Sequence, residues 1–254
     1  MIKLLKGDCL ELMKDIETGS VDMILCDLPY GTTQNKWDSV IPFDKLWRQY
    51  NRIIKDSGAI VLTAQSPFDK VLATSNIKHF RYEWIWEKNI ASGHLNIRWM
   101  PMKSHENILV FYKKPPTYNP QFETGKPYNQ NRKSKKETSG NYNDIKRIDT
   151  INKGNRNPKT VLKFDRETGL HPTQKPVELM EYLIKTYTNE NETVLDNTMG
   201  SGTTMVACQN TNRSGIGMEL DENYFNVAVT RVDGEKIKEK LDTQLTFFET
   251  RTEQ

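Results

Sequence analysis

An acid and an aromatic residue stand three positions apart in the segment "CDLPYGTT", directly after the apolar run "VDMIL". A strand that only has to end can do so at Gly or Asn. Asp27 and Tyr30, separated by the rigid ring of Pro29, instead present two side chains to one object. A carboxylate and a ring placed in this way can accept hydrogen bonds from a polar group and stack on a planar one.

A second segment combines a tight glycine turn with an acidic residue farther along the chain. Asp196 follows a short apolar run, residues 200–202 read Gly-Ser-Gly, and Thr203-Thr204 opens a predicted helix. Glycines let the backbone pass close to a ligand, and a helix start offers free N–H groups. Glu219 lies 19 residues after Gly200, at the end of the next predicted strand. An acid at that position can accept hydrogen bonds from ribose hydroxyls.

The glycine turn does not complete a dinucleotide-binding fingerprint. The pattern G-x-G-x-x-G would require a glycine where Met205 stands, which weakens a nicotinamide-dependent oxidoreductase as an interpretation. A nucleoside cofactor without a pyrophosphate fits better. S-adenosylmethionine (SAM), with its adenosine, ribose diol and amino-acid tail, is such a ligand. Taken alone, the motif is about equally typical of an ordinary strand-to-helix turn in any α/β protein.

The elements around these motifs alternate between strands and helices. β-Branched and aromatic content and short apolar runs predict strands at residues 21–27, 58–64, 81–88, 106–113, 193–196 and 214–220. Apolar spacing predicts helices at residues 43–56, ended by Ser57-Gly58, and at 175–188, from 203, and over 221–241. This alternation predicts an α/β, doubly wound fold with a mostly parallel sheet.

One segment departs from this pattern and concentrates positive charge. Residues 115–164 hold 11 basic and four acidic side chains, so they carry +7 while the rest of the chain carries −4. Their Asn, Gly and Pro content predicts an insert, with the main domain formed by residues 1–114 and 165–254. This uneven distribution of charge favours an anionic partner that binds at residues 115–164, although a solvated loop has the same composition.

Four motifs together resemble the β class of amino-group (N6-adenine/N4-cytosine) DNA methyltransferases. "DLPY" at 27–30 resembles the family's D-P-P-Y motif, and "LDNTMGSGTT" at 195–204 resembles its cofactor loop. "HPTQKP" at 171–176 matches the segment before that loop, and "KGDCLELMK" at 6–14 resembles the segment near the cofactor adenine. The order of the motifs is that of the β class, and the likeness covers nearly the whole chain except residues 115–164.

The resemblance implies a Rossmann-like SAM-dependent methyltransferase fold and site-specific methyl transfer to the N6 amino group of adenine in double-stranded DNA. The base would be flipped out of the duplex to reach the site. Asp27 and the backbone carbonyl of Leu28 would accept hydrogen bonds from the amino group and stabilise its developing positive charge. Tyr30 would stack on the base, and Pro29 would fix the backbone between them. No covalent enzyme intermediate is needed.

The resemblance also assigns binding residues. The implied cofactor-binding residues are Asp8, Cys9, Thr173, Lys175, Asp196, Thr198, Gly200, Ser201, Gly202, Thr203, Thr204 and Glu219. Asp8 would contact the SAM adenine, with a cap of the following helix as the alternative, and Thr173 or Lys175 would meet the SAM carboxylate. The insert would recognise the target, with phosphates neutralised and base edges read by its polar side chains. The implied DNA-binding residues are Arg132, Lys133, Lys135, Lys136, Arg147 and Arg156.

Two departures from the family pattern bear on activity. Leu28 stands where proline is usual, which questions the rigidity of the loop, and Thr198 replaces an aromatic residue, which predicts weaker SAM binding. By the same resemblance, Asp27 at the first position of the motif favours the N6 amino group of adenine as the group that is methylated. The alternatives are N4-cytosine methylation by the same mechanism and a catalytically inactive DNA-binding relative. Methylation at cytosine C5 would need a nucleophilic Cys, usually after Pro, and no Pro-Cys dipeptide occurs.

The remaining features predict a soluble, cytoplasmic protein with no metal and no membrane segment. Three cysteines without paired spacing are typical of a reducing compartment, and no apolar run approaches about 18 residues. His105-Glu106 lacks the second histidine of a zinc helix. Trp84, Trp86 and Trp99 are expected in the core or in the walls of a base channel. The sequence does not decide whether the protein forms a homodimer or has a cognate restriction endonuclease.

Overall fold

The computed structural model describes residues 1–31, 38–130, 150–167 and 174–234. The chain divides into two compact units, residues 120–159 and the rest. Helices of the described residues are all too short or too polar to cross a membrane.

The described residues of the main unit form one eight-stranded sheet. Its order is β1 (Ile2–Lys6), β12 (Ser214–Glu219), β11 (Thr193–Asp196), β2 (Val21–Asp27), β3 (Ile54–Ala64), β5 (Lys103–Phe111), β4 (Phe80–Ser92) and β10 (Val161–Phe164). All neighbours pair in parallel except β5, which is antiparallel to both β3 and β4. The predicted mostly parallel sheet is confirmed.

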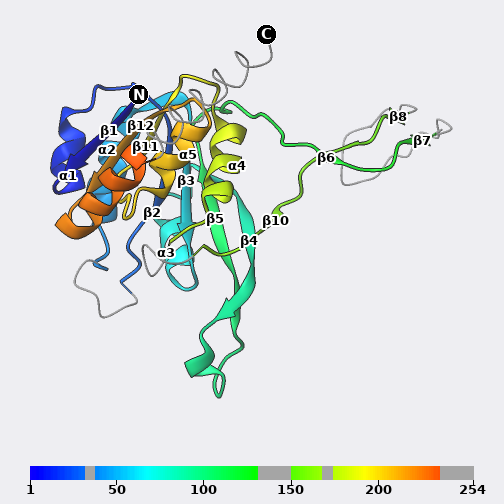
Figure 1. Ribbon diagram of the computed structural model, residues 1–254, viewed down its shortest axis with the longest axis horizontal. Helices are drawn as coiled ribbons and strands as arrows, with labels where there is room; N and C mark the ends of the chain where they lie inside the picture. Colours follow the sequence, from blue (N-terminus) through cyan, green and yellow to red (C-terminus); the bar gives the residue numbers. More distant parts are fainter. Residues whose placement is uncertain (32–37, 131–149, 168–173, 235–254) are drawn as a thin grey trace, which may run out of the picture. The chain divides into compact units, whose positions relative to one another are not determined.

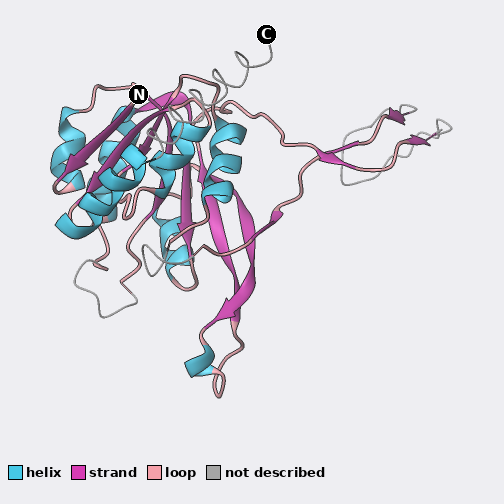
Figure 2. Ribbon diagram, viewed as in Figure 1, coloured by secondary structure: helices cyan, strands magenta, loops and turns pink. Residues whose placement is uncertain are grey.

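Helices cover both faces of this sheet, as Figures 1 and 2 show. Among the described residues the helices are α1 (Cys9–Leu12), α2 (Phe43–Ile53), α3 (Phe68–Ser75), α4 (Val177–Tyr187), α5 (Thr203–Asn210) and residues 222–234. Met13–Asp15 (η1) and His94–Asn96 (η2) form 3-10 turns. Met23 and Leu25 of β2 pack into a core with α4 and α5, whereas Ile24 and Cys26 pack into a second core with α2 and α3. Successive side chains of a strand point to opposite faces, so the doubly wound fold is confirmed.

Two predicted boundaries differ from the structure. The helix expected to end at Ser57-Gly58 ends at Ile53, because Ile54 already pairs with Val21 as the first residue of β3. Residues 161–164, expected in the insert, form β10 and pair in parallel with β4. In both places pairing with a distant strand overrides a local pattern.

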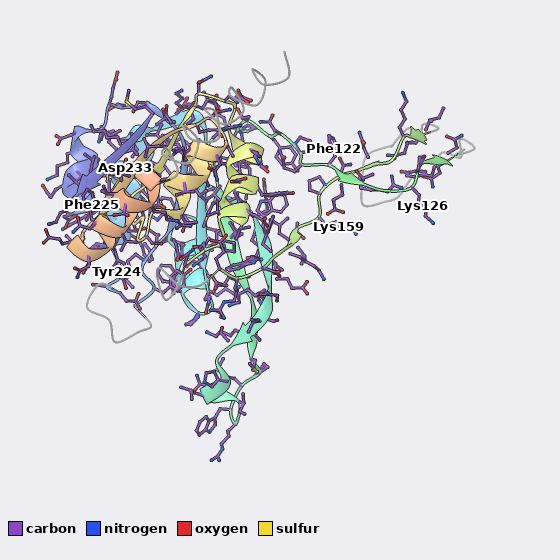
Figure 3. All side chains as sticks on the ribbon, viewed as in Figure 1. Phe122, Lys126, Lys159, Tyr224, Phe225 and Asp233 are labelled. Carbon is purple, nitrogen blue, oxygen red and sulfur yellow. The ribbon has the colours of Figure 1, made fainter. Side chains whose placement is uncertain are left out.

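The smaller unit contains two short antiparallel ladders rather than a continuous loop. β6 (Glu123–Thr124) pairs with β9 (Asn155–Arg156), and β7 (Tyr128–Gln130) pairs with β8 (Thr150–Asn152). Figure 3 labels Phe122, Lys126 and Lys159 on this unit. Of the six predicted DNA-binding residues only Arg156 falls on described residues; Arg132, Lys133, Lys135, Lys136 and Arg147 lie outside them.

Candidate active site

A cavity of about 540 Å³ opens at one edge of the main sheet. The strands β1, β2, β11 and β12 are parallel, so their carboxyl ends meet at this edge. The segments that follow those strands, residues 7–10, 27–30, 196–201 and 219–220, all line the cavity. The fold therefore brings the "DLPY" segment and the glycine turn to one site, although about 170 residues separate them in the sequence.

The Asp27 carboxylate is held by three donors. Its Oδ1 atom accepts hydrogen bonds from the Tyr30 hydroxyl at 2.6 Å and the Thr63 hydroxyl at 2.5 Å, and its Oδ2 atom accepts one from the Lys175 ammonium. Burial and the adjacent Asp27 carboxylate raise the pKa of Tyr30 well above its ordinary value. Tyr30 is therefore a neutral donor that orients Asp27.

The residues around Asp27 are fixed by packing. The ring of Tyr30 stacks on Phe68, with centroids 5.0 Å apart and planes 29° apart. The side chain of Leu28 is only 3% exposed and belongs to the same core cluster as Cys26. Apolar burial thus anchors the loop at Leu28, where the family pattern has the first of its two prolines.

A buried network of four charges extends from Asp27. Lys175 also pairs with Glu106 at 3.4 Å, and Glu106 pairs with Lys88 at 3.2 Å. Burial alone would lower the pKa of Lys175, but Asp27 and Glu106 outweigh it and raise that pKa. Burial alone would raise the pKa of Glu106, but Lys175 and Lys88 outweigh it and lower that pKa. At neutral pH two cations therefore face two anions beside the cavity.

Lys88 and Glu106 were not predicted as site residues, although both line the cavity. A signal was present in the strand alternation. Trp84, Trp86 and Lys88 occupy alternate positions of strand β4, and all three side chains are buried. A charged residue on the buried face of a strand indicates a partner of opposite charge inside the protein. For Lys88 that partner is Glu106 on the neighbouring strand β5.

On the other side of the cavity, Glu219 holds the glycine turn. Its Oε2 atom accepts the backbone N–H of Gly200 at 2.9 Å, and its Oε1 atom accepts that of Asp221 at 2.8 Å. Burial raises the pKa of Glu219. Gly202 has φ +80°, and a Cβ atom there would lie 3.0 Å from the Cβ of Ala228 in the helix of residues 222–234. The turn therefore requires glycine both for its conformation and for its packing.

We expect Gly202→Ala to disrupt the cofactor side of the cavity. The substitution adds a close contact with Ala228 to an unfavourable positive φ, so it should lower the free energy of unfolding by about 2 kcal/mol or more. Gly19→Ala is the matched control, because Gly19 has φ +66° and open space around its Cβ position. Urea unfolding of both variants measures the difference. Equal losses would show that the contact with Ala228 has no effect.

Hydrogen bonds join the segment after β11 to Asp27 at the end of β2 and to α2. The Thr198 hydroxyl donates to the backbone carbonyl of Asp27 at 3.1 Å. The adjacent Asn197 is buried, and its Oδ1 atom accepts the Tyr50 hydroxyl at 2.5 Å. The two residues that replace Pro and Phe of the family pattern thus support the junction of β2 and β11 with specific contacts.

Asp196 is almost completely buried behind the glycine turn. Burial raises its pKa to about 7, although hydrogen bonds from the Thr204 side chain and the Thr198 backbone partly offset this effect. The Thr198 N–H contacts its Oδ1 atom at 3.0 Å. Near neutral pH the carboxyl group therefore exchanges between its protonated and ionised forms.

The raised pKa of Asp196 predicts how stability depends on pH. Between the unfolded pKa of about 3.9 and the folded pKa of about 7, the folded state binds the extra proton, so stability falls as pH rises through this window. Asp196→Asn keeps an acceptor for Thr198 but does not titrate. The stability of this variant relative to the natural protein should grow by about 4 kcal/mol between pH 4 and 8. Urea unfolding at several pH values tests this, and a constant difference would contradict it.

The other predicted residues fall into three groups. Asp8 accepts the Leu10 N–H at 2.7 Å and so caps α1, and Asp8, Cys9, Ser201, Thr203 and Thr204 all line the cavity. Thr173 lies outside the described residues. Trp84 and Trp86 are in the core as expected, whereas Trp99 is 81% exposed, so the core alternative is wrong for Trp99 and the base-channel alternative stays a prediction. Trp99 lies at the tip of the hairpin that joins β4 and β5.

A family model described as DNA methylase matches residues 21–230, so the chain belongs to this family of N6/N4 DNA methyltransferases. It is 27% identical to the type II methyltransferase M.HpaI of Haemophilus parainfluenzae, over 92% of this chain and 74% of that protein. It is 24% identical to the type II methyltransferase M2.MboI of Moraxella bovis, over 94% and 93% of the two chains.

Two solved structures of DNA methyltransferases are similar to this chain. The M1.HpyAVI–SAM complex matches 91% of this chain and all of that chain, with 27% identity and a TM-score of 0.62. The PvuII cytosine-N4-specific DNA methyltransferase matches 91% and 86% of the two chains, with a TM-score of 0.67. At 16% identity the second likeness supports the fold alone.

Proposed function

We propose that this protein transfers the methyl group of SAM to the N6 amino group of adenine at specific sites in double-stranded DNA. The observation that carries the proposal is the cavity that Asp27 and Tyr30 share with the glycine turn and Glu219. One side of this cavity suits an amino group and a planar base, and the other suits a nucleoside. A methyl donor and its acceptor can therefore meet without a covalent enzyme intermediate.

The residues of the cavity fit SAM. Gly200 and Gly202 leave the backbone open to a close ligand, and Asp8, Asp196 and Glu219 supply carboxylates for adenine, the cationic tail and ribose hydroxyls. The related M1.HpyAVI was solved as a SAM complex. When bound, SAM supplies an electrophilic methyl group. Calorimetry tests this assignment: SAM should bind and NADH should not, whereas NADH binding alone would favour an oxidoreductase.

Asp27 must exchange one partner to act on a base. Its Oδ2 atom is now bonded to the Lys175 ammonium, and an incoming amino group needs that acceptor. Glu106 can hold Lys175 meanwhile, because its Oε2 atom faces Lys175 at 3.4 Å and has no hydrogen-bond partner among the described residues. Asp27 and the Leu28 carbonyl then accept the two amino N–H groups. These bonds stabilise the positive charge on nitrogen, and Asp27 is the adjacent group that can take the released proton.

Adenine is proposed as the target base because Asp27 begins the "DLPY" motif, which resembles the N6-adenine form of the family motif. N4-cytosine is the second candidate, since the same two acceptors suit its amino group. The proposed function requires label from methyl-tritiated SAM to enter unmethylated DNA of mixed sequence. The absence of label in DNA from protein that binds SAM would contradict it.

The smaller unit is proposed as the target-recognition region on the basis of its charge. Arg156 is already engaged inside that unit: its guanidinium donates to Asn152 at 2.6 Å, contacts the Lys126 carbonyl and lies 4.9 Å from the Tyr128 ring. Its DNA contact therefore stays a prediction. A cognate restriction endonuclease is proposed because the relatives are type II methyltransferases. A homodimer and a cytoplasmic location also stay predictions.

A further inference from the structure

The hairpin between β4 and β5 ends in a tip, residues 94–102, in which every residue is exposed. Five of these nine residues are large and apolar, and Leu95 and Trp99 are 80% and 81% exposed. Isolated apolar residues on a surface are ordinary, but a continuous group of this kind marks an interaction site.

The tip projects from the edge of the sheet that holds the active site. Because β5 is antiparallel to both β3 and β4, strand β4 runs in the same direction as β3 and β2. Its carboxyl end therefore leaves the sheet on the same side as Asp27. At the base of the hairpin, Lys88, Ser92 and Glu106 line the cavity, and the tip extends away from the helices, as Figure 1 shows.

The charge of the hairpin favours an anionic partner. Between Glu87 and Glu106 the sequence contains no acidic residue, while Arg98 and Lys103 are basic. A duplex whose base enters the cavity would place its phosphates beside this segment. The apolar and basic side chains of the tip match the mixture of bases and phosphates that a distorted duplex exposes.

The tip has a defined backbone shape. The N–H groups of Asn96, Trp99 and Met100 donate to backbone carbonyls within the tip at 3.0, 2.9 and 3.1 Å, and Gly93 adopts φ +89° at its start. Trp99 is thus presented to solvent by an already folded turn. A preformed turn loses little conformational entropy when it binds.

We propose that residues 94–102 insert into DNA beside the flipped base, with Trp99 stacked against a base that flipping has exposed and Arg98 at a phosphate. The inference rests on the proposed function, because a base must leave the duplex. Flipping removes one base from the stack, and an aromatic or apolar side chain can occupy the space left behind. The hairpin is a DNA contact separate from the unit of residues 120–159.

A second copy of the chain fits this surface less well. A two-fold interface would bring the same tip from both copies together, so Arg98 and its basic neighbours would face their counterparts. Charge complementarity therefore favours DNA.

The test compares Trp99→Ala, Trp99→Phe and the control Ile77→Ala in DNA binding by fluorescence anisotropy. Ile77 is 65% exposed and precedes β4, so it lies near the opposite edge of the sheet. Loss of base stacking should weaken DNA binding by Trp99→Ala about 10-fold, and the aromatic ring of Trp99→Phe should retain most of the affinity. Ile77→Ala should match the natural protein, and all variants should bind SAM equally.

Sedimentation of each variant separates the alternatives. Unchanged DNA affinity in Trp99→Ala, measured beside natural protein that methylates the same DNA, would overturn the inference and leave the proposed function intact. If Trp99→Ala keeps its DNA affinity but sediments with a lower molecular mass than the natural protein, the tip would be assigned to self-association. Natural protein that binds SAM but methylates no DNA would count against the proposed function, and the anisotropy comparison would still decide whether the tip contacts DNA.

Discussion

Asp27→Asn should reduce methyl transfer by at least about 10²–10³-fold while leaving the SAM dissociation constant within about threefold of its natural value. Asparagine keeps the shape of the side chain but has one acceptor atom and no charge. It therefore cannot stabilise the positive charge that develops on the amino nitrogen. Cofactor binding should survive because Glu219 and the glycine turn lie on other loops. Single-turnover transfer rates and calorimetry with SAM measure the two effects.

Thr63→Val is the matched control for this prediction. It removes one hydrogen bond to Asp27 Oδ1 and keeps the carboxylate, and Tyr30 continues to donate to the same oxygen. We expect Thr63→Val to lower the rate of methyl transfer about 10-fold, which is consistent with the loss of one hydrogen bond that positions Asp27. Near-normal turnover by Asp27→Asn would show that the assigned role of Asp27 is wrong.

Glu106→Gln should lower the free energy of unfolding by about 3 kcal/mol, because it leaves the buried ammonium groups of Lys88 and Lys175 with one carboxylate between them. The exposed pair of Glu87 and Lys163 supplies a control from the same strand β4. Glu87→Gln should cost about 0.5 kcal/mol or less, since solvent screens that pair. Urea unfolding at neutral pH measures both.

A double variant separates charge balance from the loss of a contact. Glu106→Gln combined with Lys88→Met returns the network to one cation and one anion, and methionine fills a similar volume. We expect the double variant to recover at least half of the stability lost by Glu106→Gln alone. If the two substitutions are instead additive, the charges do not act as one network.

The sequence predicted the layout of the site because that layout follows from local patterns. Apolar runs placed Asp27, Asp196 and Glu219 at the ends of strands, and parallel strands bring such ends together. The doubly wound sheet followed from the same alternation of elements. What could be predicted was therefore which segments meet at the cavity.

The contacts inside the site could not be predicted from local patterns. Lys175 pairs with Asp27 across 148 positions, and nothing in "HPTQKP" selects that partner over the SAM carboxylate predicted for it. Similarly, Trp99 is exposed because it lies at the tip of the hairpin between β4 and β5, whereas tryptophan is highly buried on average. The end of α2 at Ile53 was set by pairing of Ile54 with β2.

The two departures from the family pattern have structural explanations that favour an active enzyme. Leu28 is buried in the core beside Cys26, and Thr198 bonds to the Asp27 carbonyl. Both residues fix the position of Asp27 relative to the glycine turn. A chain that had lost catalysis would have no reason to keep this junction together with Tyr30 and Glu219.

Nucleoside mass spectrometry of unmethylated, mixed-sequence DNA incubated with SAM and this protein tests the central claim most directly. The account predicts N6-methyldeoxyadenosine with the natural protein and almost none with Asp27→Asn. N4-methyldeoxycytidine would keep the roles of Asp27 and Leu28 and correct the base. DNA without any methylated nucleoside, from protein that binds SAM, would contradict the account and favour a DNA-binding relative without catalytic activity.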